Sequence, residues 1–435
     1  MKSKKHGLFL AVAFGLSCAF FSCGGSVEEQ LKNKYPIATL PAPTDAASLA
    51  LSAGAADEAS IVAANTKFSL ALLKKLTATQ PKDNVFCSPF NVAAAFGQLY
   101  LGANGQTETE ISQVFNWQTN SEAHHQAVAD LYKKLISNRE EGAPVLKIAN
   151  KFWVNKDFAT YAAYKERLQK YYATELLALD FANGAEAAQN INAWVSEKTN
   201  DKIKQVFTPE AIKPSMQFVI ASALYFQANW QTPFDANNTK DELFKTPSGD
   251  KSLPMMNEVF SHSLRYFEGA NWQAVALPYK NGSMEMYVLL PKEEVDIQTF
   301  IQSLTDTTLA ELISQKGLDF DEVEVYLPRW KAEYSTELLA PLADMGMAAS
   351  LKKLELSRLT DAKNLAVGAV IHKTFVEVNE RGTEAAAVTA ITTEATSAAP
   401  REKQKYYFKA NRPFVYFIAE QKTKTVLFAG QLTAP

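Results

Sequence analysis

Apolar residues recur at helical spacing in the first half of the chain and in strand-like runs in the second half. The helical pattern begins near residue 60, where apolar residues return every three or four positions at Ile61, Ala64, Phe68, Leu72 and Leu76. Comparable patterns predict further helices over residues 90–101, 122–137, 160–172 and 185–200. From about residue 215, runs rich in β-branched and aromatic residues predict strands at 218–220, 224–226, 274–277, 284–290, 323–327, 367–378, 414–419 and 426–428. Helices followed mainly by strands predict an α+β fold with mostly antiparallel sheets.

The order of these elements also indicates how many domains the chain contains. No repeat and no second linker interrupts the pattern, so residues 58–435 are predicted to form one domain. Residues 24–57 differ, because several prolines precede a run rich in alanine and serine, and no apolar periodicity persists there. We therefore interpret residues 23–57 as a tether that precedes the domain.

The first 23 residues have the character of an export signal. Lysines at positions 2, 4 and 5 precede an apolar run over residues 8–21, which is shorter than a typical transmembrane helix. The run ends at Phe20-Phe21-Ser22-Cys23 and resembles a bacterial lipobox, in which signal peptidase cuts before the cysteine and the thiol is acylated. Phe20 departs from the leucine that is usual in that motif, and an ordinary signal peptide is the alternative. The resemblance implies a signal peptide over residues 1–22 and an exported lipoprotein, attached to the outer membrane or cell surface through Cys23 alone.

Charge and cysteine content exclude some classes of function. The chain has 435 residues, of which 47% are hydrophobic and 21% are charged, as in ordinary globular proteins. Loss of residues 1–22 would remove three lysines and no acid, which changes the net charge from −3 to about −6. This balance argues against nucleic-acid binding, which needs a basic face. With Cys23 acylated, Cys87 is the one free cysteine of the exported chain, so the hydrophobic core must stabilise the protein without an intrachain disulfide.

Motifs for catalysis are missing from the sequence. The histidines are His6, His124, His125, His262 and His372, and neither Gly-x-Ser-x-Gly nor His-Glu-x-x-His occurs. His372 lies in an apolar run, where a hydrogen-bonded core histidine is the simplest interpretation. A triad assembled from scattered residues is the remaining alternative. We therefore expect no enzymatic activity, no metal and no cofactor.

One long segment near the C-terminus breaks the pattern of short connections. About 27 residues separate the strand that ends at Val378 from the strand near Tyr406, and loops of that length are usually functional or disordered. In extended conformation, one face of this segment would carry only small or apolar residues, at Thr383, Ala385, Ala387, Thr389, Ile391 and Thr393. The other face would carry Glu384, Ala386, Val388, Ala390, Thr392 and Glu394. The segment is thus a strand that could be buried on one side, with a helix over 384–388 or a flexible spacer as alternatives.

The start of this segment carries a family signature. Residues 380–387 resemble the hinge of inhibitory serpins through Glu380, Gly382, Thr383, Glu384, Ala385, Ala386 and Ala387. Weaker matches to the family occur in the expected order at residues 84–89, 101–105, 224–234, 277–279, 289–291, 372–379, 411–414 and 426–430. Because these matches extend over some 350 residues, the chain is identified as resembling an inhibitory, bacterial type of serpin.

The resemblance implies a fold and a mechanism. The expected fold has three mainly antiparallel β-sheets, eight or nine helices and an exposed reactive loop, in a monomeric protein. The expected function is inhibition of a serine protease as a suicide substrate, with cysteine proteases left open as further targets. The protease attacks the loop, and the loop then inserts into the main sheet as a new strand. A non-inhibitory carrier or chaperone is the alternative; such members often carry bulky, charged or proline residues in the hinge, and residues 383–389 carry none on the inserting face.

Two ways of counting place the reactive bond differently. Counting from the hinge, as in inhibitory members, places it after Thr396, before Ser397, with Ala395 as the neighbouring choice. Counting back from residues 411–414 places it near Ala399 to Glu402, where Arg401 would suit a trypsin-like enzyme. We prefer the hinge count, because the inserted length determines how tightly the protease is compressed. The small residues there favour an elastase- or subtilisin-like protease.

The resemblance also implies two polar contacts near the main sheet. The family's hinge glutamate usually pairs with a basic residue that follows Leu-Pro, so we expect a salt bridge between Glu380 and Arg329. Most serpins also have a serine two residues after the Ser-Pro of an early helix, and an asparagine before the Ala-x-Tyr-Phe strand. Here these residues are exchanged, as Asn91 and Ser222. We expect Ser88, Asn91, Ser222 and His372 to form one buried hydrogen-bond cluster that holds the sheet closed. The alternative is that Asn91 faces solvent.

Overall fold

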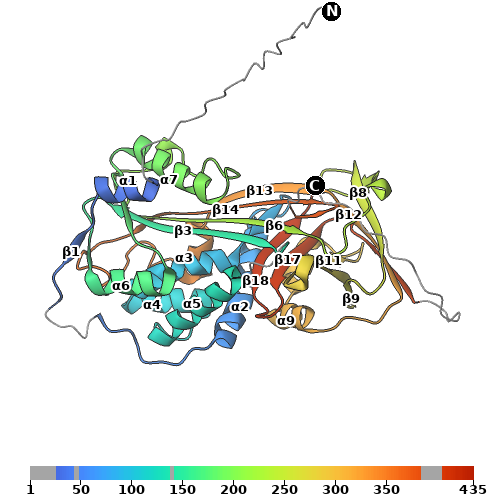
Figure 1. The fold of residues 1–435 in the computed structure, drawn as a ribbon, viewed down its shortest axis with the longest axis horizontal. Helices are drawn as coiled ribbons and strands as arrows, with labels where there is room; N and C mark the ends of the chain where they lie inside the picture. The colour runs from blue at the N-terminus through green and yellow to red at the C-terminus, as the bar shows by residue number, and fades with distance from the viewer. Residues whose placement is uncertain (1–25, 44–48, 138–141, 384–403) are drawn as a thin grey trace, which may run out of the picture.

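Three large β-sheets and ten α-helices make up the described part of the protein (Figure 1). This computed structural model describes residues 26–43, 49–137, 142–383 and 404–435. Several residues singled out above lie outside these ranges, namely Cys23, Glu384, Ala385, Ala386, Ala387, Ala395, Thr396, Ser397 and Arg401. Among the described residues, no helix is both long and apolar enough to cross a bilayer.

The helices mostly begin at a residue that caps the first turn. Asp57 and Ser60 form a capping box at the second helix, and Ser88 caps the third with its hydroxyl on the Asn91 N–H. The described helices are α1 Val27–Lys34, α2 Glu58–Thr79, α3 Pro89–Gly102, α4 Gly105–Phe115, α5 Glu122–Ile136, α6 Ala162–Tyr172, α7 Gly184–Lys198, α8 Ile297–Ser303, α9 Asp306–Ser314 and α10 Leu339–Leu342. The count exceeds the expected eight or nine because α1 precedes the predicted domain and α10 is a single turn.

The main sheet crosses most of the molecule. Its strands, in spatial order, are β13 Trp330–Glu337, β14 Val367–Asn379, β15 Gly382–Thr383, β6 Phe218–Asn229, β3 Val145–Asn155 and β5 Leu177–Leu179. Helices α1 and α7 lie on one face of this sheet, and α3 to α6 lie on the other (Figure 1). The strand β3 interrupts the helical first half of the chain, and α8 and α9 interrupt the second half, so the predicted separation of helices from strands holds only in part.

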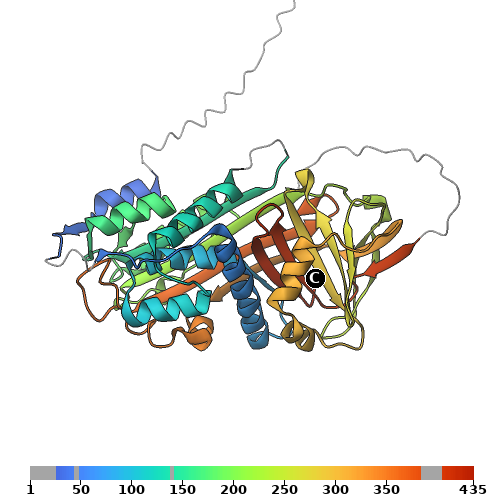
Figure 2. The same ribbon diagram turned by 90° about the horizontal axis from the view of Figure 1, so that it is seen from below.

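Two further sheets lie at the opposite end of the molecule from α6 (Figures 1 and 2). The second sheet contains β2 Val85–Cys87, β18 Val426–Leu432, β17 Phe414–Glu420, β11 Met284–Pro291, β10 Trp272–Pro278 and β9 Arg265–Glu268. The third contains β16 Lys405–Lys409, β12 Glu322–Pro328, β8 Lys251–Phe260 and β7 Lys240–Phe244. A short parallel pair joins β1 Ala38–Leu40 to β4 Ala159–Tyr161.

Alternation along β6 divides the interior into two parts. Even-numbered residues such as Phe218, Leu224 and Phe226 belong to the large core that includes α3 and the second sheet. Odd-numbered residues such as Val219 and Ala221 pack in a smaller core beneath α7. Both faces of the main sheet are therefore buried at β6, which explains why its sequence is an almost unbroken apolar run.

Part of the predicted tether folds against the domain. In α1, Leu31 is 2% exposed and joins the core under α7. The carboxylate of Glu28 lies 3.1 Å from the Lys151 ammonium on β3 and accepts a hydrogen bond from Trp194 at 2.8 Å. Lys151 is only 4% exposed, so Glu28 is the counterion of a buried charge. The tether interpretation is therefore wrong for residues 27–40, whose order depends on partners distant in sequence.

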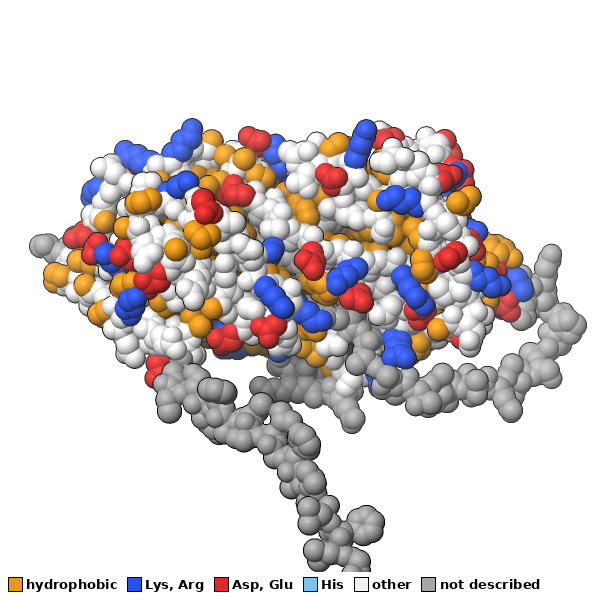
Figure 3. All heavy atoms as spheres, turned by 90° about the horizontal axis from the view of Figure 1, so that it is seen from above, with side chains coloured by type: hydrophobic (Ala, Val, Ile, Leu, Met, Phe, Trp, Pro, Cys, Tyr) orange, Lys and Arg blue, Asp and Glu red, His pale blue; other side chains and the backbone are white. Residues whose placement is uncertain are grey.

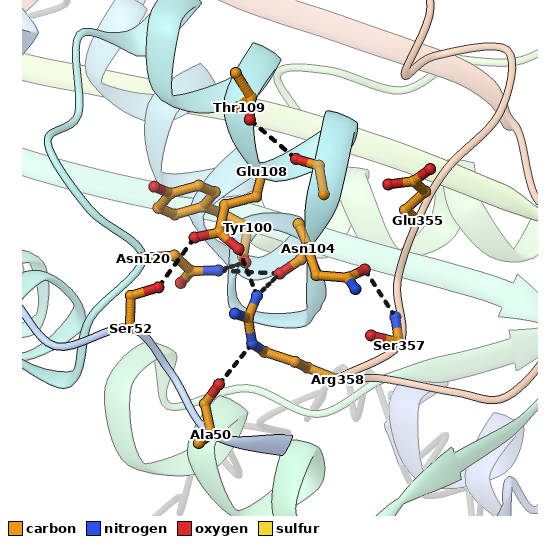
Figure 4. A network of polar contacts seen from close by, with 12 residues as sticks. Ala50, Ser52, Tyr100, Asn104, Glu108, Thr109, Asn120, Glu355, Ser357 and Arg358 are labelled. Atoms are coloured by element: carbon orange, nitrogen blue, oxygen red, sulfur yellow. Dashed lines mark hydrogen bonds and ion pairs between the residues drawn. The ribbon is translucent and has the colours of Figure 1, made fainter. Parts of the chain in front are cut away.

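A second group of contacts holds residues 50–52 (Figure 4). The guanidinium of Arg358 pairs with Glu108 at 2.6 Å and donates to the carbonyl oxygens of Ala103 and Ala50. Ser52 donates its backbone N–H to the Asn120 carbonyl at 2.9 Å. The N-terminal segment is thus joined to the ends of α3 and α4 as well as to the main sheet.

Replacing Glu28 by glutamine should lower the free energy of unfolding by about 3 kcal/mol, because the buried Lys151 ammonium would lose the carboxylate that it pairs with. Denaturant unfolding followed by tryptophan fluorescence measures the change. The matched control is Glu29→Gln, since Glu29 is the next residue of α1 and is exposed. Equal stability of the two variants would show that the Glu28–Lys151 pair contributes nothing.

Candidate functional site

The central seam of the main sheet is the contact between β6 and β14, and β15 occupies its upper end. Below this point the two strands pair directly and in parallel, from Val367 opposite Phe218 to Phe375 opposite Tyr225. Above it, β15 lies between them, with Thr383 opposite both Val378 of β14 and Ala228 of β6. Two residues near the start of the long segment, Gly382 and Thr383, therefore already form an antiparallel strand inside the main sheet.

The turn that leads into β15 is fixed by its neighbours. The backbone N–H of Trp230 donates to the Arg381 carbonyl at 2.8 Å, and its indole N–H donates to the Asn379 carbonyl at 3.0 Å. The backbone N–H of Phe234 donates to the Glu380 carbonyl at 2.9 Å. Because the carbonyl oxygens of residues 379–381 all accept hydrogen bonds, the turn before β15 is held in one conformation that directs the chain into the sheet.

Gly382 is required at the position where the chain passes into the sheet. Its φ of +149° is a conformation that residues with a Cβ rarely adopt. A Cβ placed there would lie 2.1 Å from the carbonyl oxygen of Ala228 and 2.6 Å from the Cα of Asn229. The close approach of the two backbones therefore excludes any side chain at this hinge residue.

Thr383 faces the large core rather than α7. It is 0% exposed, and its hydroxyl lies 2.7 Å from the hydroxyl of Tyr279. The Tyr279 ring stacks on Trp230 with a centroid separation of 4.5 Å. This contact determines which face of a longer strand would be buried, because residues at alternate positions after Thr383 would share its face.

Glu380 and Arg329 lie in contact at the top of the sheet. The Arg329 Nη2 lies 2.5 Å from Glu380 Oε1, and Thr239 donates its hydroxyl to the same oxygen at 2.5 Å. Burial raises the pKa of Glu380, but the hydrogen bonds from Arg329 and Thr239 outweigh it and leave the pKa below its ordinary value. The glutamate is therefore a charged anchor for the hinge turn, which ties β14 to the end of β12.

The four residues Ser88, Asn91, Ser222 and His372 lie together beneath the seam. The Asn91 side-chain N–H donates to Ser222 Oγ at 2.8 Å, and Ser222 Oγ lies 3.2 Å from His372 Nδ1. The backbone N–H of Ser88 donates to His372 Nε2 at 2.9 Å. All four residues are at most 2% exposed, so the alternative of a solvent-facing Asn91 does not hold.

The geometry of this polar cluster determines the protonation state of His372. A backbone N–H can only donate, so Nε2 must be unprotonated and the imidazole proton lies on Nδ1, toward Ser222. Burial lowers the pKa of His372 from 6.5 to about 4. His372 and Ser222 are also direct partners in the β6–β14 ladder. A neutral imidazole therefore bridges α3 to both strands of the seam.

Some residues of this site were not selected from the sequence. Trp230 and Tyr279 lie inside segments that resemble the family, but nothing in their local pattern shows that they contact the hinge. Thr239 carries no sequence signal, because the loop before β7 brings it to Glu380 only in the folded protein.

On the face shown in Figure 3, basic and acidic side chains of the described residues are interspersed, without a region of one sign.

Comparison with known proteins identifies the family. The family model described as "Serpin (serine protease inhibitor)" matches residues 63–435. An uncharacterized serpin-like protein of Thermococcus kodakarensis is 35% identical over 381 residues, which are 87% of this chain and 86% of the relative. The leukocyte elastase inhibitor of Sus scrofa is 33% identical over 385 residues, which are 86% of this chain and 99% of the relative.

The similarity extends to solved structures. Human thyroxine-binding globulin superposes with a TM-score of 0.77 at 25% identity, over 87% of this chain and 100% of the globulin. The fold is thus the serpin fold, with the three sheets that the sequence resemblance implied. The chain therefore belongs to the serpin family, whose members are described as serine protease inhibitors.

The exchange of serine and asparagine in the polar cluster should show energetic coupling. Asn91→Ser removes the hydrogen bond to Ser222, and Ser222→Asn crowds the same site, so each should destabilise the native protein by about 1–3 kcal/mol. The double variant should recover most of the loss, because it restores one amide and one hydroxyl. A double-mutant cycle from denaturant unfolding measures the coupling. Additive losses would show that the two positions are independent.

Acid should destabilise the native state between pH 6.5 and pH 4 in part through His372. In this range His372 is protonated in the unfolded chain but stays neutral in the folded protein. The free energy of unfolding therefore decreases as pH falls, by up to about 1.4 kcal/mol per pH unit. We expect a shallower pH dependence in His372→Gln than in the parent. The control is His262→Gln, an exposed histidine. Parallel pH profiles for parent and His372→Gln would exclude this role.

Proposed function

We propose that this serpin inhibits a serine protease as a suicide substrate, by inserting its reactive loop into the seam between β6 and β14. The observation that carries this proposal is the position of β15. Its Thr383 is buried and paired on both sides, so the strand that insertion would lengthen has already begun. No residue at the hinge has to reverse direction for the loop to continue along the seam.

The pairing of strands supplies a driving force for insertion. In the present structure β6 and β14 form one parallel ladder. A strand continued from β15 would be antiparallel to both of them, so one parallel ladder would be exchanged for two antiparallel ladders. Antiparallel pairing is somewhat more stable per residue, and the added strand would satisfy its own backbone groups. The inserted form should therefore be the more stable one, with a kinetic barrier that preserves the native form.

The register of β15 supports the reactive bond expected from the hinge. Each further residue after Thr383 would move one position down β6 from Ala228, so residue 393 would lie opposite Phe218, the first residue of that strand. Thr396 would then lie about 10 Å beyond the end of the strand at about 3.3 Å per residue, and Arg401 about 26 Å beyond it. Cleavage after Thr396 or Ala395 would leave only a short segment between the sheet and the attached protease, whereas cleavage at Arg401 would leave a long one.

The residues around that bond support an elastase- or subtilisin-like target. Ala395, Thr396 and Ser397 are small, which suits a shallow specificity pocket. One relative is named as an inhibitor of leukocyte elastase. Cysteine proteases remain a second class of target, since they also form acyl-enzymes on a loop of this kind. We further propose that the protein is exported and held at a membrane by acylation of Cys23.

Incubation with an elastase-like protease should give a covalent complex that survives boiling in detergent. Gel electrophoresis detects the complex, and mass spectrometry of the released C-terminal peptide should place the cleavage after Thr396, within one residue. A panel of serine and cysteine proteases extends the test to other targets. If every protease that cuts within residues 390–402 is released active, the inhibitor function is wrong and a carrier function is favoured.

Replacing Thr383 by arginine should convert the inhibitor into a substrate. Residue 383 already lies in the core beside Tyr279 in the native structure, where an unpaired charge is costly, so the arginine should displace β15 from the sheet and make insertion slower than deacylation. The stoichiometry of inhibition should rise at least tenfold, while the cleavage site remains the same. Thr383→Ala is the control, since it keeps a small residue at this position. A normal stoichiometry for Thr383→Arg would contradict insertion through this seam.

A further inference from the structure

A cavity of about 700 Å³ lies between the N-terminal segment and the outer edge of the main sheet. Residues 35–37, the helix α6 and the edge strand β5 enclose it, and Figure 1 shows α1, β1 and α6 together at this end of the molecule. Cavities that bind small molecules usually have volumes of roughly 300–1,000 Å³. The space is therefore large enough for a ligand of that size.

The inner wall of this cavity is apolar. Leu168 of α6 and Leu176 and Leu177 at the start of β5 line it, and all three side chains are buried in the protein. Ile37 lines the cavity from the N-terminal segment and packs against the large core. The preceding residues are held in place by Tyr35, whose hydroxyl donates to a carboxylate of α7 at 3.2 Å. A ligand could therefore bury an apolar body against side chains that are already fixed.

The cavity also contains a cation whose charge is not compensated. The Lys165 ammonium donates to the Ile37 carbonyl at 3.1 Å and to the Thr39 hydroxyl at 2.8 Å, and no carboxylate of the described residues forms an ion pair with it. Both partners are neutral, and an ammonium can donate a third hydrogen bond. Burial lowers the pKa of Lys165, as expected for a partly desolvated cation without an acidic neighbour. An anion at this position would stabilise the charge.

The other charged groups at the cavity differ from Lys165 in their surroundings. Lys32 pairs with Glu175 at 2.8 Å, and the Lys170 ammonium lies 3.8 Å from a carboxylate of α5. Glu166 is exposed to solvent. Among the described residues that line the cavity, three lysines thus face two glutamates, and Lys165 is the cation available to an anionic ligand.

We propose that this cavity binds a fatty acid, with the carboxylate at Lys165 and the hydrocarbon chain along Leu168, Leu176 and Leu177. The carboxylate would accept a charge-assisted hydrogen bond from the ammonium. The chain would cover the apolar wall, where each buried CH₂ group increases affinity about fourfold. A short anion would leave that wall in contact with water, and an uncharged lipid would leave Lys165 without a counterion.

The N-terminal segment adds this site to the domain. Residues 35–37 lie before residue 63, where the match to the family model begins. A bound ligand would touch this segment, α6 and β5 at once, so it should stabilise the folded protein. The site does not depend on the proposed inhibition of a protease, because neither the seam nor the hinge contributes a residue to it.

Isothermal titration calorimetry of the full-length protein with octanoate, decanoate and uncharged 1-decanol tests the site. Decanoate should bind about fifteenfold more tightly than octanoate, because two further CH₂ groups are buried. Lys165→Met should weaken decanoate binding about tenfold, since it keeps the apolar stem and removes the charge, and should leave 1-decanol binding unchanged. The matched control is Lys170→Met, which should bind decanoate as the parent does, because Lys170 already has a carboxylate neighbour.

A second variant, Ile37→Trp, separates binding in the cavity from adsorption elsewhere. The larger side chain should fill the cavity and abolish binding of both decanoate and 1-decanol, while an unchanged Tm shows that the variant is folded. Parent-like decanoate affinity in folded Ile37→Trp or in Lys165→Met would overturn the proposal, as would a parent protein that does not bind decanoate. Binding of the parent to phosphatidylglycerol vesicles through Lys165, without binding of decanoate, would also overturn it and assign this lysine to a membrane surface.

Discussion

The pairing of Thr383 with both β6 and β14 is the contact on which the rest of the site depends. It fixes the register of any longer strand, the face that such a strand would bury and the depth at which each loop residue would lie. It is possible only because Gly382 lacks a side chain where its backbone passes Ala228. The hinge carbonyls bound by Trp230 and Phe234 and the pair of Glu380 with Arg329 hold this arrangement in place.

Below that contact, the seam is closed by a parallel backbone ladder and by a few buried polar groups. The ladder between β6 and β14 is parallel, and the polar cluster beneath it depends on a neutral His372. Partly satisfied polar networks contribute less than fully satisfied ones, and among the described residues the Asn91 carbonyl has no hydrogen-bond donor. The polar cluster beneath the seam is thus satisfied only in part in this structure.

The N-terminal segment shows the limit of local sequence patterns. Helix α1 has eight residues and buries mainly Leu31, too little apolar surface for a short helix to be stable alone. Its order depends on Lys151 and Trp194, which lie more than one hundred residues away in the chain. The strands β3 and β8 were likewise missed, because lysine and asparagine interrupt their alternation, whereas β6, β14, β17 and β18 are apolar enough to be predicted.

The sequence by itself determined the α+β class, most central strands and the serpin signature, because periodicity and short motifs are local properties. The pairing of Glu380 with Arg329 and the meeting of four polar residues beneath the sheet were expected only through the resemblance to the family, which carries long-range information that no local pattern contains. Only the tertiary structure decided that β15 pairs with both β6 and β14, that Thr383 contacts Tyr279, and that Asn91 Oδ1 has no hydrogen-bond partner among the described residues. These facts depend on the relative positions of β6, β14 and α3, and no local pattern encodes the register between strands that are more than one hundred residues apart.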